Sequence, residues 1–294
     1  MAFKKLWAAE ADDHALALAW DGENLLVTPS TGSMLLLDAG GGITAKLPGH
    51  GLGNGAASVA NAGVVTCGFD GHVRYYDHAG ASIRDITLGK DWIERVRWSP
   101  DGRHLGAALG KTLFILNKEG ETIRTMTQQS TVSDFAWNPK DPLKITTVGG
   151  GGARMWKLGE SEAYARFDWG GASLLVDWSP DGRWLVTGDQ TPSVHLYDFT
   201  RDYPLHIQGY EAKVKTMAFS PNGKKLATGG GPMVTVWDCT GKTGPENTTP
   251  AQLNFHKGDV ETLAWSPDGE TLATGDITGR LVFSDAKGKP FAAF

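Results

Sequence analysis

The sequence predicts an all-β fold in which one small antiparallel sheet is repeated along the chain. The first observation is a recurring turn, Ser-Pro-Asp-Gly at Ser99–Gly102, Ser179–Gly182 and Ser266–Gly269, each after a short apolar segment that ends in tryptophan. The second is the period. Trp20 and Trp265 close the first and the last of these segments, and the six steps between them average about 41 residues. No helical periodicity of useful length competes with this pattern.

The unit around the variant turn Ser220–Gly223 illustrates why four strands are expected in each repeat. Val214–Phe219 carries apolar residues at alternating and adjacent positions, as a strand buried on both faces would. Proline presets φ in the turn, and Asn-Gly tolerates the positive φ of a tight hairpin. Lys225–Thr228 and Met233–Asp238 are then the second and third strands, and Ala251–Phe255 can serve as the fourth.

The same pattern of an inner strand followed by later strands fits six further places, so seven units result. They are Ala15–Trp20 with Met34–Asp38, Ala56–Ala60 with Val64–Gly68 and His72–Asp77, Ile93–Trp98 with Thr112–Asn117, Val132–Trp137 with Ala153–Leu158, Ser173–Trp178 with Val194–Asp198, and Val260–Trp265 with Arg280–Asp285.

These repeats resemble the WD-repeat family of β-propellers, and the resemblance covers essentially the whole chain. It implies a single domain over residues 1–294, an all-β seven-bladed β-propeller of four-stranded antiparallel blades. It also implies that Trp137, Trp178 and Trp265 are wedges between blades. The sequence departs from the family pattern in two ways. The family's Gly-His motif occurs clearly only at Gly49-His50, and its Trp-Asp motif occurs in full only at Trp237-Asp238.

The hydrogen-bond network that Gly-His and Trp-Asp support in the family is therefore expected to be mostly missing. The turn aspartates Asp70, Asp189 and Asp276 remain. For closure of the ring we expect residues 3–8 to supply the outermost strand of the last blade, as is usual in the family. Residues 289–294 are the competing candidate.

Composition limits the class of partner. Lys and Arg number 28 and Asp and Glu 33, which gives a net charge of −5 and no basic excess for nucleic acid. No stretch reaches the ~18 apolar residues of a membrane helix. Cys67 and Cys239 lie in different repeats and are expected to be buried small hydrophobes. We therefore expect a cytoplasmic protein without a nucleic-acid or membrane partner.

Sequence motifs give no support for an enzyme, a cofactor or a metal. The eight histidines are scattered, with no two at a recognised metal spacing. The glycine run Gly149–Gly152 lacks the Lys-Ser/Thr that a phosphate loop requires, and is interpreted as a turn between strands.

One alternative is a small-molecule or metal-dependent binding or enzymatic site in the central channel, which the family lines with the first strand of each repeat. Most copies of that strand carry small residues, whereas Arg95, Arg97, Asp134 and Asp177 are charged. Charge pairing between neighbouring blades, or a water-exposed channel wall, is the simpler and favoured explanation of these charges, and a polar pocket for a small charged ligand is the alternative.

The favoured hypothesis is a non-enzymatic platform, a scaffold or adaptor subunit that binds a protein or peptide through one aromatic-rich rim. In the family this rim is formed by the loops that enter each first strand and the turns between second and third strands. Aromatic residues flanked by charges are typical of binding hot spots. The candidate rim residues are Trp92, Trp169, Tyr210, Phe69, Lys90, Asp168, Gln190, Glu211, His256 and Lys257.

Two other possibilities stay open. Trp92 and Trp169 could instead tuck under neighbouring loops and plug the rim. The protein could also be a purely architectural subunit, held by its blade edges or by the polar insertion at residues 242–250. A monomer or a subunit of a larger complex is expected in either case.

Overall fold

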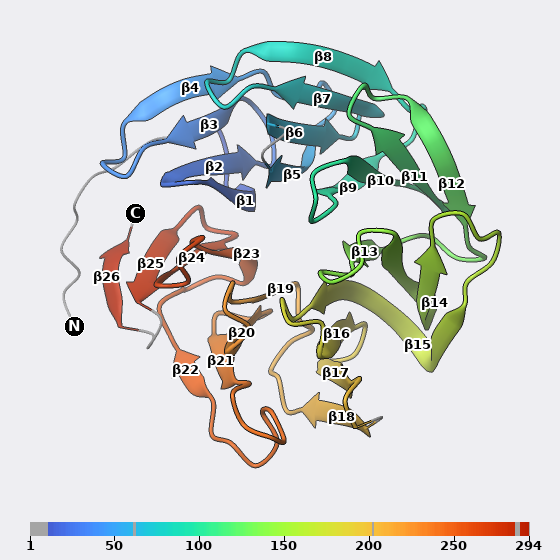
Figure 1. Cartoon of the computed structure of the whole chain (residues 1–294). Coiled ribbons are helices and arrows are strands. Elements are labelled where there is room, and N and C mark those ends of the chain that lie inside the picture. The colour runs from blue at the N-terminus through green and yellow to red at the C-terminus, as the bar shows by residue number, and fades with distance from the viewer. Residues whose placement is uncertain (1–10, 61–62, 202, 286–288, 294) are drawn as a thin grey trace.

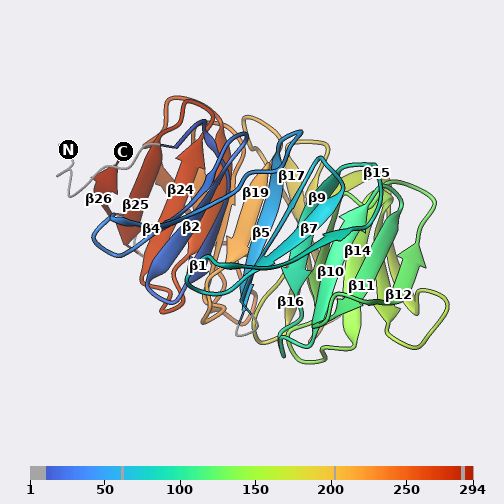
Figure 2. The same ribbon diagram turned by 90° about the horizontal axis from the view of Figure 1, so that it is seen from above.

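The structure, a computed structural model, describes residues 11–60, 63–201, 203–285 and 289–293. These residues form strands and turns, and among them no helix is long and apolar enough to span a membrane. The strands lie in six hydrogen-bonded antiparallel sheets, arranged in a ring about a common centre (Figure 1). Figure 2 shows the ring from above, with the strands of successive sheets side by side. The predicted all-β propeller architecture is thus confirmed.

Five sheets have four strands each, in chain order from the centre outward. They are β1 (Ala15–Asp21), β2 (Asn24–Pro29), β3 (Met34–Leu37) and β4 (Ile43–Leu47); β5 (Asn54–Ala60), β6 (Gly63–Gly68), β7 (His72–Tyr76) and β8 (Ser82–Thr87); β9 (Ile93–Trp98), β10 (His104–Leu109), β11 (Thr112–Asn117) and β12 (Thr122–Thr127); β19 (Thr216–Phe219), β20 (Lys225–Gly229), β21 (Val234–Asp238) and β22 (Ala251–Leu253); and β23 (Val260–Trp265), β24 (Thr271–Asp276), β25 (Leu281–Asp285) and β26 (Pro290–Ala293).

The remaining sheet has six strands and departs from the prediction. It contains β13 (Asp134–Trp137), β14 (Lys144–Lys157), β15 (Ala165–Trp178), β16 (Trp184–Asp189), β17 (Ser193–Asp198) and β18 (Tyr203–Gln208). The count of seven separate four-stranded sheets is therefore not matched. The reason is that β15, which is 14 residues long, is continuous across the expected boundary between two units, because it includes the predicted first strand Ser173–Trp178 of the second unit. β14, also 14 residues long, lies within the first of these units.

β14 nevertheless changes direction within its length. The amide of Leu158 donates to the carbonyl of Leu143 at 2.7 Å, so residues just beyond the two ends of β14 lie side by side. Gly151 and Gly152 have φ of 85° and 95°, which only glycine adopts readily, and the register with β15 shifts between Gly150 and Gly152. Gly149–Gly152, predicted as a turn between two strands, thus lies within the continuous strand β14, where that strand changes direction.

The Ser-Pro-Asp-Gly segments form the expected hairpin turns. At Ser99, the hydroxyl donates to Asp101 Oδ1 at 2.6 Å and accepts the amide of His104 at 2.9 Å. Gly102 has a φ of 64° and donates its amide to the carbonyl of Ser99 at 2.8 Å. This turn thus fixes the register of the strands on either side.

The hydrophobic core lies between neighbouring sheets rather than in one central mass. One cluster, for example, combines Val65 and Val73 of the second sheet with Val96 and Leu105 of the third. Comparable clusters fill the contacts between the other neighbours. Apolar burial therefore holds the ring together, because each sheet needs both of its neighbours.

Tryptophans contribute to these contacts as predicted. Trp137, Trp178 and Trp265 are all buried. The indole Nε1 of Trp137 donates to the carbonyl of Arg97 at 3.0 Å, and that of Trp265 to the carbonyl of Ala218 at 3.2 Å, in each case on the preceding sheet.

The first and last sheets complete the ring, since β1 contacts both β23 and β24. Among the described residues, the C-terminal strand β26 occupies the outer position of the last sheet, with Val282 opposite Ala293. The predicted closing strand at residues 3–8 lies outside the described residues.

Candidate functional site

The rim candidates that the structure brings together are Phe69 and Trp92. Their rings stack with centroids 4.8 Å apart and an interplanar angle of 27°. Trp92 is 59% exposed, which is unusual for so large an apolar side chain held against another ring. The pair therefore presents a fixed aromatic surface to solvent.

Two loops hold this pair in position. Phe69 lies in the turn between β6 and β7, and Trp92 precedes β9. The amide of Leu88 donates to the carbonyl of Gly71 at 3.0 Å, which ties these loops together. The amide of Phe69 donates to Gly53 at 2.9 Å, where φ is 123° and an added Cβ would lie 2.9 Å from the Phe69 ring. Glycine at position 53 thus allows the ring its place.

A cavity of about 260 Å³ lies beside Trp92. Asp91 and Glu94 line it together with Trp92 on one side, and Gly110 and Val132 come from the neighbouring loops. The cavity combines an aromatic wall with two carboxylates, which suits a partner that offers apolar and basic groups together.

Trp169, by contrast, packs onto its own sheet. Its ring centroid lies 4.4 Å from that of His195 and 5.7 Å from that of His206. The two imidazoles are register partners on β17 and β18, and they stack 4.0 Å apart at an angle of 7°. Asp189 accepts a hydrogen bond from His195 Nδ1 at 2.7 Å.

Among the residues that the structure describes, Asp189, His195 and His206 form a group that could hold a metal, because their ligand atoms lie within 4.8 Å of one another. Spacing along the chain did not reveal them, since the two histidines meet only through the register of β17 and β18. In parallel stacked rings the nitrogen lone pairs run parallel and do not converge, so a shared ion would require the rings to turn.

Two rim candidates are mostly or wholly inside the protein. The Tyr210 hydroxyl lies 3.1 Å from Thr228 Oγ1 and accepts the Trp237 indole N–H at 3.0 Å, and burial raises the pKa of Tyr210. His256 is buried, with Nδ1 2.9 Å from Asp276 Oδ2 and Nε2 2.8 Å from Thr274 Oγ1. Both side chains are anchored within their sheet rather than offered to solvent.

The other rim candidates are exposed side chains: Lys90, Asp168, Gln190, Glu211 and Lys257. Of these, Asp168 lies 3.7 Å from Arg154.

Three of the four channel candidates pair with one another. Arg97 Nη2 lies 3.1 Å and Arg95 Nε 3.5 Å from the buried carboxylate of Asp134. Arg97 also donates to the carbonyls of Phe135 and Val176. Asp134 accepts the amide of Val176 at 3.0 Å. These groups thus connect β9, β13 and β15 across the inner strands.

Asp177 lies apart from this group. It accepts the amides of Trp178 and Phe219, both at 2.9 Å, and burial raises its pKa to about 6.

The His50 side chain forms the same arrangement as His256. Its Nδ1 lies 2.8 Å from Asp70 Oδ1 and its Nε2 3.0 Å from Thr66 Oγ1. Burial lowers the pKa of both histidines. The expectation of a mostly missing network thus overlooked His256, where phenylalanine replaces the glycine that usually precedes the histidine.

Comparison with known proteins agrees with this geometry. The family model "WD domain, G-beta repeat" matches residues 175–198, 202–238 and 247–283. The matched repeats and the relatives support a WD-repeat β-propeller protein. The matched part of this WD-repeat protein contains the Ser-Pro-Asn-Gly turn at Ser220, the Trp237-Asp238 pair and the His256 network.

Three relatives illustrate the likeness. The WD-repeat protein is 26% identical over 157 residues to "WD repeat-containing protein AAC3" of Dictyostelium discoideum, covering 50% of this chain and 33% of the relative. It is 25% identical over 146 residues to "Meiotic recombination protein rec14" of Schizosaccharomyces pombe, covering 46% of this chain and 47% of the relative. It is 26% identical over 223 residues to "Actin-interacting protein 1" of Drosophila melanogaster, covering 73% of this chain and 36% of the relative. The chain thus spans less than half the length of each of these relatives.

Proposed function

We propose that this WD-repeat protein is a non-enzymatic platform that binds a protein or peptide, with the Phe69–Trp92 pair in its contact face. The observation that carries the proposal is the stack itself, because an indole that is 59% exposed and held by a second ring is ordered before any partner arrives. A preordered aromatic anchor loses little conformational entropy on binding.

The carboxylates beside the pair favour a particular kind of partner segment. Asp91 and Glu94 line the cavity next to Trp92, so a basic side chain adjacent to an apolar one would be matched there. One relative, by its name, interacts with actin, which supports a protein as the partner class without assigning actin to this chain.

The test is affinity purification followed by mass spectrometry, comparing wild type with Trp92→Ala. Ile83→Ala on the outer strand β8 is the matched control, since Ile83 is 56% exposed and lies near the start of β8, at the other end of that strand from the loop that carries Trp92. We expect Trp92→Ala to lose captured proteins at an unchanged melting temperature, and Ile83→Ala to keep both. Retention of the same proteins by the Trp92 variant would exclude this contact face.

We further propose that the six-stranded sheet comprises two blades joined through the continuous strand β15. This gives seven blades in one domain over residues 1–294. The contacts of the innermost strands support this count. They run in one closed series, β1, β5, β9, β13, β15, β19, β23 and back to β1, with β13 and β15 both in the six-stranded sheet. A crystal structure in which β13 to β18 pack as one undivided blade would contradict it.

A further inference from the structure

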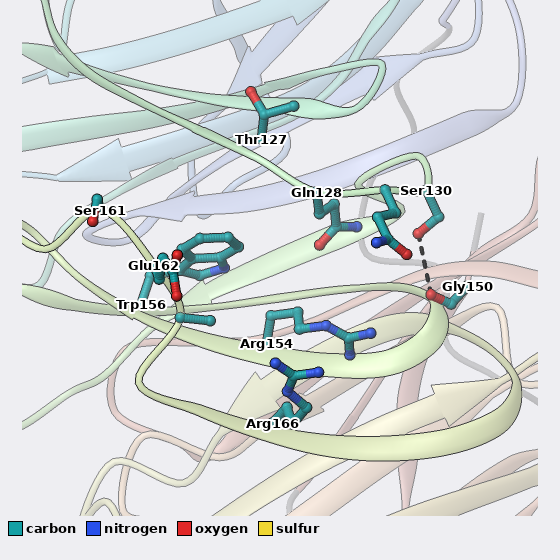
Figure 3. Close-up of a pocket in the computed structure, with 11 residues that line it drawn as sticks. Thr127, Gln128, Ser130, Gly150, Arg154, Trp156, Ser161, Glu162 and Arg166 are labelled. Atoms are coloured by element: carbon teal, nitrogen blue, oxygen red, sulfur yellow. Dashed lines mark hydrogen bonds between the residues drawn. The ribbon is translucent and has the colours of Figure 1, made fainter.

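A second cavity, of about 500 Å³, lies between the end of β12 and strands β14 and β15 of the six-stranded sheet (Figure 3). Its walls come from the loop after β12, from β14 and β15, and from the loop between them. The residues that matter for its chemistry are Gln128, Ser130, Arg154, Trp156, Glu162 and Arg166.

The two arginines reach this cavity because of strand register. Arg154 on β14 and Arg166 on β15 are direct partners, so their side chains leave the sheet on the same face. Met155, between Arg154 and Trp156, points to the opposite face and packs with Ala153 in the core toward the next sheet. Figure 3 shows both arginine side chains extending from neighbouring strands into the same space.

The positive charge of this pair is poorly compensated. Arg154 lies 3.7 Å from Asp168, a 70% exposed carboxylate, and otherwise donates to the carbonyls of Gly151 and Ala153. The Arg166 side chain has no hydrogen bond or ion pair with any residue that the structure describes. Like charges directly opposite on neighbouring strands destabilise a sheet, and a bound anion would remove that cost.

The geometry points to an oxyanion site, and we propose that Arg154 and Arg166 together bind a phosphate monoester. Two guanidinium groups offer planar pairs of N–H donors, which match the terminal oxygens and the double negative charge of such a group. The volume of the cavity admits a phosphorylated side chain or a small phosphate ester with room to spare. The site is separate from the Phe69–Trp92 rim and does not depend on it.

Glu162 allows a test in which a substitution should make anion binding tighter rather than weaker. Its carboxylate lines the same cavity, so it opposes an anion held by the arginines. Glu162→Gln should therefore strengthen binding several-fold, an effect that a general loss of folding cannot mimic.

The experiment is isothermal titration at low ionic strength with inorganic phosphate, with a short phosphoserine peptide and with its unphosphorylated form. We expect saturable binding of phosphate groups that weakens as salt is raised. Arg154→Gln and Arg166→Gln should each lower affinity about tenfold or more, and the double variant should abolish binding. Arg103→Gln is the control, because Arg103 is 76% exposed and pairs with Asp101 on a turn.

The two ligands distinguish the source of the phosphate. Tighter binding of the phosphopeptide would indicate a phosphorylated protein, and equal binding a small phosphate-bearing molecule. No saturable binding of either ligand at millimolar concentration would overturn the proposal. Equal binding by wild type and the double arginine variant would do so as well.

Discussion

The carboxylate of Asp177 on β15 accepts the backbone amide of Phe219 on β19, with Oδ2 2.9 Å from the nitrogen. β19 is the inner edge of its sheet, so some of its amides have no partner in the ladder. A side chain from the neighbouring inner strand satisfies this one. Asp177 is thus a connection between sheets.

Hydrogen bonds of this kind, from a backbone amide to a side chain on the neighbouring inner strand, also occur elsewhere around the ring. Asp134 Oδ2 accepts the amide of Val176 at 3.0 Å, and Ser58 Oγ accepts the amide of Trp98 at 3.1 Å. An unpaired buried amide costs about 1–3 kcal/mol, so each of these bonds matters for the stability of the ring. The polar residues of the inner strands therefore have a structural explanation that needs no ligand.

Asp177 should make stability depend on pH in a specific window. Burial raises its pKa to about 6 in the folded state, above roughly 4 in the unfolded chain. The folded state binds the proton more tightly, so this contribution is fully present below pH 4 and is lost as the pH rises to about 6. Asp177→Asn removes it. Chemical denaturation across this range should show that wild type loses stability relative to the variant, by an amount on the order of 1–2 kcal/mol, because the other titrating groups are common to both proteins. A stability difference between the two proteins that does not change with pH would contradict the assignment.

The sequence predicted the inner strands well because their pattern is local. Ile93–Trp98 and Val260–Trp265 match β9 and β23 to the residue. Tryptophan before a Ser-Pro-Asp-Gly turn identifies a strand end without knowledge of the rest of the chain. What the local pattern could not define was where one sheet ends, because the continuity of β14 and β15 depends on hydrogen bonds between strands.

The candidate site was predicted less well, since its contacts join residues distant in sequence. Phe69 and Trp92 were both expected on the rim, but their stacking depends on two loops that meet through Gly71. His256 was expected on the same rim because it lies in the loop that enters β23. Its burial follows from Thr274 and Asp276, some 20 residues further on, which sheet geometry brings to it.

The His256 network should be a major source of stability. His256→Ala leaves Thr274 and Asp276 without their partner in the interior, at a cost of about 2–4 kcal/mol. Burial also lowers the pKa of His256, so the unfolded chain takes up this proton more readily. Stability should therefore fall as the pH drops below the ordinary value of 6.5.

Urea denaturation at neutral and mildly acidic pH measures both effects of His256. His78→Ala is the control, because the His78 side chain is 50% exposed and pairs with Asp21 at the surface. That variant should keep nearly wild-type stability at neutral pH. A His256 variant as stable as wild type would show that the network contributes little.

A comparison of two buried tryptophans, Trp98 and Trp137, separates the contribution of packing from that of hydrogen bonding. Both are buried, but Trp137 Nε1 donates to the carbonyl of Arg97 at 3.0 Å, whereas Trp98 Nε1 has no partner among the described residues. Replacement by alanine should cost about 3–5 kcal/mol at either position. Replacement by phenylalanine should cost about 1 kcal/mol more at Trp137, because only there is a hydrogen bond lost. Denaturant unfolding of the four variants measures this difference. If the two phenylalanine variants lose the same unfolding free energy, the Trp137 hydrogen bond does not stabilise the protein.

Cys67 and Cys239 should be chemically silent in the folded protein. Both thiols are free and buried, and burial raises the pKa of each to about 12. At pH 8 almost no thiolate is present, and reagents cannot reach the sulfur. A thiol-specific chromogenic reagent should detect no fast reaction in native buffer and two thiols per chain in denaturant. The native rate should then follow the rate of unfolding, so the destabilised His256→Ala variant should react faster than wild type. A thiol that reacts rapidly in the native protein would mean that its sheet opens locally, and the position of that cysteine would identify the sheet.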